Sequence, residues 1–176
     1  MTTQIILAGF GGQGILFAGK LLAYAGMLNG KEVSWLPSYG PEMRGGTANC
    51  SVIISDEQIA SPIIQRPDVL LALNGPSLEK FEDAVVKGGT IIYDASLIAS
   101  AKENADVNVC GIAATETAIN MDAKTLANMV MLGKFIKETN VFTMDQLKDA
   151  LKKLMPPSKA ALYDLNCKVL DAGYEL

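Results

Sequence analysis

The chain has 176 residues, of which 49% are hydrophobic and 19% are charged, and its formal net charge is −4. This length suits one domain with a substantial core, and the acidic balance argues against a nucleic-acid binder, which needs a basic face. Histidine is absent, which excludes a Ser-His-Asp or Cys-His catalytic pair and a histidine-ligated zinc ion within this chain.

An apolar strand at residues 5–8 leads directly into the sequence GFGGQG at residues 9–14, which a helix at residues 14–29 follows. This G-x-G-x-x-G spacing between strand and helix lets the backbone approach an anionic ligand, whose charge the helix N-terminus favours. We therefore expect phosphate or another anion here. A tight turn whose glycines serve only helix-to-strand packing is the alternative.

The apolar run at residues 5–28 has nearly the length of a membrane-spanning helix. Its glycines would break the first third of such a helix, and Lys20 would lie near its centre. A signal peptide would require a lysine or arginine before the apolar run, and none is present there. We expect a buried strand and a core helix, with no membrane span.

The second strand is expected at residues 32–36, and its end tests whether the turn binds a dinucleotide. A dinucleotide fold places an acidic side chain there for the ribose hydroxyls. Here Glu32 stands at the beginning of the strand, and the end reads Leu36-Pro37-Ser38. Neither a carboxylate nor an arginine for a 2′-phosphate is present at that end, so NAD and NADP are poor candidates.

The sequence SYGPEMRGG at residues 38–46 follows this strand as a second glycine-rich loop. Arg44 beside two glycines predicts a compact anion cradle, because a planar five-donor fork would lie next to exposed backbone amides. A polar surface loop is the alternative. Two glycine-rich loops at the ends of successive strands favour a shared crevice, because neighbouring parallel strands converge there.

The remaining pattern alternates strands and helices, as in a doubly wound α/β domain. Further strands are expected at residues 47–55, 68–73, 90–93 and 107–110, and further helices at residues 78–86, from 113, 126–136, 144–154 and 158–172. Ser77, Ser158 and a Thr143–Gln146 capping box are the expected helix caps. Asn74 and Asp94 end strands, and they either face the crevice or cap the following helix. We predict a single domain over residues 1–176, built on one open, mostly parallel sheet with helices on both faces and a Rossmann-like first βα unit.

Three cysteines, Cys50, Cys110 and Cys167, are far apart and show no C-x-x-C spacing. They cannot supply the four organised thiolates that an iron–sulfur cluster needs. Their odd number suits reduced thiols in a cytoplasmic protein. From the high apolar content we expect some apolar surface of this chain to be buried in a contact with another subunit.

The glycine-rich turn and the second loop, in this order, resemble the gamma subunit of 2-oxoacid:ferredoxin oxidoreductases, which act on 2-oxoglutarate, pyruvate, 2-oxoisovalerate or indolepyruvate. The resemblance extends over essentially the whole chain, including residues 55–59 and 128–133. The amino-acid sequence of the second loop and the chain length favour the 2-oxoglutarate type.

The resemblance implies a complex that decarboxylates a 2-oxoacid on thiamine diphosphate with Mg²⁺, reduces ferredoxin through iron–sulfur clusters and releases an acyl-CoA. This chain would be a non-catalytic accessory subunit that binds no cofactor alone. Its implied partners are thiamine-binding alpha and beta subunits and a ferredoxin-like delta subunit, with coenzyme A passing nearby. A homodimer of the isolated chain is left open.

The implied contact face combines the glycine-rich turn and the second loop. Its candidate residues are Gly9, Gly11, Gly12, Gln13, Gly14, Tyr39, Gly40, Pro41, Glu42, Arg44, Gly45 and Gly46. Two rival hypotheses remain, a free-standing nucleotide-binding oxidoreductase and a nucleotide-sensing module. Both predict that the isolated chain binds a nucleotide.

Overall fold

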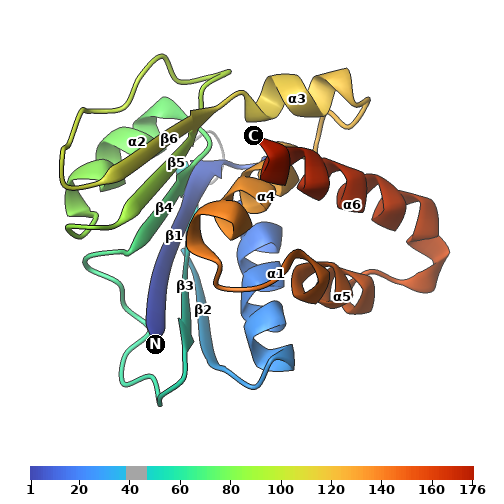
Figure 1. Cartoon of the computed structure of the whole chain (residues 1–176), viewed down its shortest axis with the longest axis horizontal. Coiled ribbons are helices and arrows are strands. Elements are labelled where there is room, and N and C mark those ends of the chain that lie inside the picture. Colours follow the sequence, from blue (N-terminus) through green and yellow to red (C-terminus); the bar gives the residue numbers. More distant parts are fainter. Residues whose placement is uncertain (39–46) are drawn as a thin grey trace.

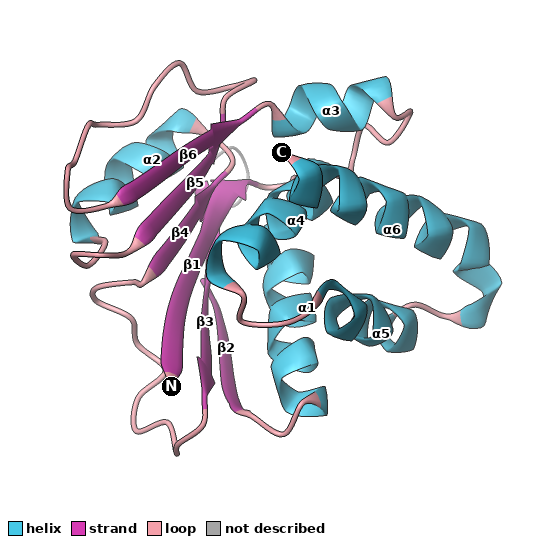
Figure 2. Ribbon diagram, viewed as in Figure 1, coloured by secondary structure: helices cyan, strands magenta, loops and turns pink. Residues whose placement is uncertain are grey.

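The computed structural model describes residues 1–38 and 47–176, and it contains one six-stranded sheet in the order β2-β3-β1-β4-β5-β6 (Figures 1 and 2). The strands are β1 (Thr2–Phe10), β2 (Glu32–Ser38), β3 (Thr47–Ser55), β4 (Val69–Ala72), β5 (Thr90–Asp94) and β6 (Asn108–Ile112). The helices are α1 (Ile15–Leu28), α2 (Gly75–Phe81), α3 (Ala114–Asn120), α4 (Ala127–Thr139), α5 (Met144–Leu154) and α6 (Ala160–Glu175), with short 3-10 turns at Glu82–Ala84 and Pro157–Lys159.

The strands confirm a mostly parallel sheet with one exception. β1, β4, β5 and β6 pair in parallel, whereas β3 runs antiparallel to both of its neighbours, β1 and β2. Because β3 lies between β1 and β2, the first two strands of the chain are not neighbours. The assumption that these two strands are neighbours, from which the shared crevice was expected, is therefore wrong.

Both faces of the sheet carry helices, as predicted, but unequally. Alternate residues of β1 point to opposite faces, as the period of a strand requires. Ile5 and Leu7 belong to the larger core, which includes side chains of α1, α4, α5 and α6, whereas Ile6 and Ala8 pack with residues of α2 in a smaller core. Figure 1 shows α2 on one side of the sheet and the longer helices α1, α4, α5 and α6 on the opposite side. In the described part of the chain, no helix has the length and apolar character to cross a membrane.

Two of the predicted helix caps are wrong. The side chain of Asn74, not Ser77, caps α2, because its Oδ1 accepts the backbone N–H of Ser77 at 2.8 Å. α6 begins at Ala160 after a 3-10 turn and has no side-chain cap, so Ser158 does not cap it. The Thr143–Gln146 capping box of α5 is confirmed in both directions.

Helices α4 and α6 pack with their backbones in direct contact. A Cβ at Gly133 would collide with the carbonyl oxygen of Leu170, and one at Gly173 would collide with the carbonyl oxygen of Val130. Glycine is required at both positions because no side chain fits between the helices.

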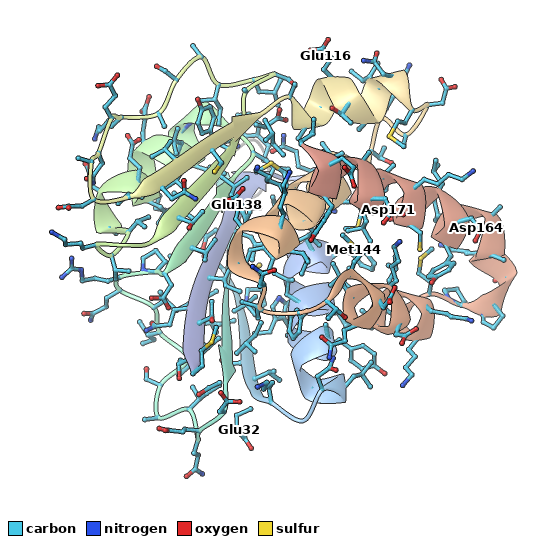
Figure 3. The ribbon with its side chains drawn as sticks, viewed as in Figure 1. Glu32, Glu116, Glu138, Met144, Asp164 and Asp171 are labelled. Carbon is cyan, nitrogen blue, oxygen red and sulfur yellow. The ribbon has the colours of Figure 1, made fainter. Side chains whose placement is uncertain are left out.

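Acidic side chains on these helices, among them Glu138 and Asp171 (Figure 3), contact neighbouring elements. The carboxylate of Glu138 in α4 pairs with Nζ of Lys134 in the same helix at 2.7 Å. It also accepts a hydrogen bond from Nδ2 of Asn108 in β6 at 3.1 Å. The Lys134 hydrogen bond lowers the pKa of the Glu138 carboxyl below its ordinary value. Lys148 of α5 pairs with Asp171 of α6 at 2.6 Å. The helical layer is thus joined both to the β6 edge and within itself.

Candidate functional site

The glycine-rich turn (residues 9–14) connects the end of β1 to α1, as expected. Gly14 has φ of 73° and stands at the N-cap position of α1, where no side chain caps the helix. Gly12 has φ of 95°. Both torsions lie in the left-handed region, which glycine adopts without strain. The turn thus presents an uncapped helix N-terminus at the carboxyl edge of the sheet.

The side chain of Gln13 folds back into this turn. Its Oε1 accepts the backbone N–H of Phe10 at 2.6 Å, and its Nε2 donates to the carbonyl oxygen of Leu73 at 3.1 Å. Leu73 follows β4, so the carboxamide links the ends of two adjacent parallel strands. Both hydrogen-bond partners of the Gln13 side chain thus lie inside the chain.

Two glycines of the turn make room for protein side chains. A Cβ at Gly9 would lie 2.6 Å from Oε1 of Gln13 and 2.8 Å from Cδ1 of Ile15. A Cβ at Gly14 would lie 2.5 Å from Nδ2 of Asn128. Both distances are too short for real side chains, so internal packing already requires glycine at these positions.

Asn128 is a residue that sequence reasoning missed. It lies at the start of α4, is 4% exposed, and donates from Nδ2 to the carbonyl oxygen of Gly14 at 3.1 Å. Its Oδ1 accepts the backbone N–H of Met129 at 3.0 Å. The available signal was a single amide side chain within an apolar helical run. Such a residue needs a buried partner.

The turn lies at a topological switch point of the sheet. The chain leaves β1 for α1 on one face and leaves the adjacent β4 for α2 on the other face. Ligands of open α/β sheets bind in the crevice at such points. Among the described residues, Nδ2 of Asn74 and Oγ of Ser77, both buried beside this point, have no hydrogen-bond partner.

Asp94 ends β5 and is fully buried. Its carboxylate accepts the hydroxyl of Thr115 at 2.5 Å, the backbone N–H of Thr115 at 3.2 Å and that of Ser96 at 3.0 Å. Because Thr115 lies in the first turn of α3, Asp94 anchors this helix to the sheet. Asn74 thus caps the following helix, one of the two alternatives that the sequence left open, whereas Asp94 binds the first turn of α3 without standing at its N-cap.

The second glycine-rich loop connects β2 to β3 along the chain. All seven of its candidate residues lie outside the described residues: Tyr39, Gly40, Pro41, Glu42, Arg44, Gly45 and Gly46. The flanking strands place the two ends of this loop at the carboxyl edge of the sheet, where β3 starts beside Phe10 of β1. The ends of the loop and the glycine-rich turn therefore lie at one edge.

The described residues do not fit a dinucleotide. The strand beside β1 on this side is the antiparallel β3, so no parallel strand ends where the ribose would lie. Glu32 pairs with Ser55 at the opposite edge of the sheet. The sequence-based argument against NAD thus gains a topological reason.

The side chains of the described residues support neither a metal site nor a redox site. The described residues contain no group of three or more His, Cys, Asp or Glu side chains that would hold a metal ion. All three cysteines are free thiols. Burial raises the pKa of the Cys50 thiol to about 12, which keeps it protonated and unreactive.

A hollow of about 560 Å³ lies beside α2 on the smaller core side, outside the predicted site. Lys102 crosses its rim and bonds to Glu82 at 3.4 Å and to Asp83 at 2.7 Å. Glu79 and Ser100 also line the hollow.

Comparison with known proteins identifies relatives along the whole chain. Residues 4–176 match the family model described as pyruvate ferredoxin/flavodoxin oxidoreductase. Subunit VorA of ketoisovalerate oxidoreductase from Methanothermobacter thermautotrophicus is 42% identical over 98% of this chain, and subunit KorC of 2-oxoglutarate synthase from Methanocaldococcus jannaschii is 35% identical over 100%. The chain spans only 36% of VorA but 94% of KorC.

Solved structures of known proteins share the fold. The gamma subunit of a keto/oxoacid ferredoxin oxidoreductase from Geobacter sulfurreducens matches with a TM-score of 0.84 and 28% identity, covering 98% of this chain and 96% of its own. The 2-oxoglutarate:ferredoxin oxidoreductase from Magnetococcus marinus, solved with 2-oxoglutarate, coenzyme A and succinyl-CoA bound, matches with a TM-score of 0.89 and 27% identity, covering 99% of this chain and 30% of its own. On its family match and its sequence identity to VorA and KorC, this chain belongs to the pyruvate ferredoxin/flavodoxin oxidoreductase family.

Proposed function

We propose that this chain is the gamma, accessory subunit of a 2-oxoacid:ferredoxin oxidoreductase. The complex would oxidatively decarboxylate a 2-oxoacid, with 2-oxoglutarate favoured, to an acyl-CoA and CO₂ while reducing ferredoxin. The observation that carries the proposal is the alignment with KorC, which covers the whole of this chain and 94% of that subunit. The higher identity to VorA makes a branched-chain 2-oxoacid the second candidate substrate.

The chain contributes structure to this complex, and the reactive groups lie on other subunits. Thiamine diphosphate with Mg²⁺ would be held by alpha and beta subunits, and the iron–sulfur clusters by these and a ferredoxin-like delta subunit. The three separate cysteines support this division for the iron–sulfur clusters, because each cluster needs four organised thiolates.

The contact face combines the glycine-rich turn with the second glycine-rich loop. Its residues are Gly9, Gly11, Gly12, Gln13, Gly14, Tyr39, Gly40, Pro41, Glu42, Arg44, Gly45 and Gly46. Two aromatic side chains support a protein contact at this edge, because Phe10 is 42% exposed and Phe17, in the first turn of α1, is 37% exposed. Arg44 would place a positive charge beside the path of coenzyme A.

Residues 1–176 would form one domain in the cytoplasm. Both cores are built on the same sheet, which supports a single folding unit. A homodimer of the free subunit would be replaced by the contact with alpha and beta.

The test is co-expression with candidate alpha, beta and delta subunits, followed by purification through a tag on this chain. We expect thiamine-binding and iron–sulfur subunits to copurify, and we expect reduction of ferredoxin that depends on coenzyme A and on 2-oxoglutarate. Replacement by 2-oxoisovalerate, pyruvate and indolepyruvate in parallel assays identifies the substrate.

Calorimetric titration of the isolated chain with NAD and AMP separates the rival functions. A free-standing oxidoreductase would bind NAD, and a nucleotide sensor would bind AMP. Either result, together with a failure to copurify any partner, would overturn the subunit assignment.

A further inference from the structure

The glycine-rich turn has the spacing of a phosphate-binding loop, yet its interior is filled by the chain itself. We infer that the carboxamide of Gln13 is the permanent occupant of this turn, so that it holds the diphosphate neither of NAD nor of coenzyme A. The part of the inference that concerns coenzyme A rests on the proposed function, whereas the part that concerns NAD is independent of it.

The acceptor side of the carboxamide takes the place of a phosphate oxygen. Oε1 of Gln13 lies 2.6 Å from the backbone nitrogen of Phe10 and accepts its hydrogen bond. A phosphate oxygen cannot approach the same N–H while Oε1 is there. Gly9 leaves no further space, because a single added methyl group would meet this oxygen and Ile15.

The donor side explains why an anion would be a poor replacement. Nε2 of Gln13 donates to the carbonyl oxygen of Leu73 at 3.1 Å. A phosphate that displaced the side chain would bring further acceptor oxygens toward this carbonyl and would leave it without its donor. An unsatisfied buried acceptor opposes binding. A carboxamide satisfies both strand ends because it carries one acceptor and one donor group.

The third glycine of the pattern is also committed to the protein. Asn128 fills the space beneath Gly14 and donates to its carbonyl oxygen at 3.1 Å. The turn is therefore held by β4 through Gln13 and by α4 through Asn128. These two contacts define its shape without a ligand.

The outer surface of the turn remains free of these contacts. Phe10 is 42% exposed, Gly11 and Gly12 are exposed, and no described atom lies within 4 Å of a Cβ built at Gly12. A preformed, self-satisfied turn with an exposed aromatic side chain suits contact with another protein surface, because little conformational entropy is lost on binding. The turn would act through its shape.

Amide NMR of the full chain provides the first test. Titration with ADP, NAD and coenzyme A to millimolar concentration should leave the amide signals of Phe10, Gly12 and Gly14 unchanged. Saturable shifts of these three signals with ADP would overturn the inference, because ADP carries the diphosphate that the pattern predicts.

Two variants test whether Gln13 is the occupant. Gln13→Ala removes the carboxamide, and Gln13→Met keeps the volume without the hydrogen bonds. Both should greatly accelerate hydrogen exchange of the Phe10 amide, whereas Gln4→Ala, a change at the opposite end of β1, should not. Unchanged protection of Phe10 in both Gln13 variants would show that the carboxamide does not hold the turn.

The assembled complex provides the coenzyme A test. Complexes that contain Gln13→Met should assemble less well but should show an unchanged KM for coenzyme A. A KM raised about tenfold, equivalent to roughly 1.4 kcal/mol of lost binding, with normal assembly would overturn the inference. If the wild-type chain forms no complex, the proposed function fails while the NMR result still decides the occupancy of the turn.

Discussion

The side-chain nitrogen of Asn128 lies 3.1 Å from the carbonyl oxygen of Gly14, although 114 residues separate the two positions in the sequence. The contact joins the first residues of α4 to the turn that precedes α1. It places a buried amide beside a glycine with φ of 73°, where no side chain would fit. The shape of the candidate site therefore depends on the C-terminal helical layer.

This contact predicts a stability cost for Asn128→Ala. The substitution removes both side-chain hydrogen bonds, while the Gly14 carbonyl keeps the N–H of Ala18 and the Met129 N–H keeps the carbonyl of Leu126. We therefore expect a loss of about 1 kcal/mol in the free energy of unfolding. Urea denaturation measures it. Asn120→Ala, at the exposed end of α3, is the matched control and should change stability by less than about 0.5 kcal/mol. Equal effects of the two substitutions would contradict the assigned role of Asn128.

The α4–α6 contact predicts a strong effect of Gly133→Ala. A Cβ would meet the carbonyl oxygen of Leu170 and would lie 2.7 Å from the backbone nitrogen of Tyr174, so the helices must separate. We expect destabilisation of about 3 kcal/mol, as for an overpacked core. Gly75→Ala is the control, because no described atom lies within 4 Å of its added Cβ. Thermal and urea unfolding of both variants compare the two sites, and a stable Gly133→Ala protein would show that the helices tolerate separation.

The ion pairs of Asp56 predict that the stability of the folded chain depends on pH. Its hydrogen bond with Lys31, followed by that with the Met1 ammonium at 2.7 Å, lowers the pKa of the carboxyl from its ordinary 3.8 to about 2. Because the folded pKa is below the unfolded one, the contribution to stability is present above pH 3.8 and is lost as the pH falls toward 2. Carboxyl NMR titration measures the pKa directly.

Lys31→Ala should move the pKa of Asp56 back toward its ordinary value. Lys20→Ala, at an exposed position on α1, should leave it unchanged and serves as the control. An Asp56 pKa that is the same in wild type and Lys31→Ala would mean that the pair does not persist in solution.

Arg44 predicts a functional effect in the assembled complex. If its positive charge borders the path of coenzyme A, Arg44→Ala should lower coenzyme A-dependent turnover. Arg66→Ala provides a matched control, because Arg66 is exposed just before β4, at the opposite edge of the sheet. Steady-state kinetics with coenzyme A varied measure both, and unchanged kinetics and assembly in Arg44→Ala would refute the role of this residue.

The local elements were largely predictable because their signals are local. The bounds predicted for α5 and β3 agree with the structure, and the capping box of α5 has both of its hydrogen bonds. An apolar run located β4 for the same reason, since strands buried on both faces are continuously apolar. The cap of α2 was misassigned because serine and asparagine both cap helices, and only the backbone torsions place Asn74 at the N-cap.

The sequence by itself determined that a glycine-rich turn joins a strand to a helix, that this chain lacks histidine and paired cysteines, and that the fold is α/β. Tertiary structure decided what those glycines accommodate. Strand order places β3 beside β1, and pairing between distant segments brings Leu73 and Asn128 to the turn. Glycine spacing specifies only that space must exist, because a phosphate and a buried carboxamide require the same absence of a Cβ.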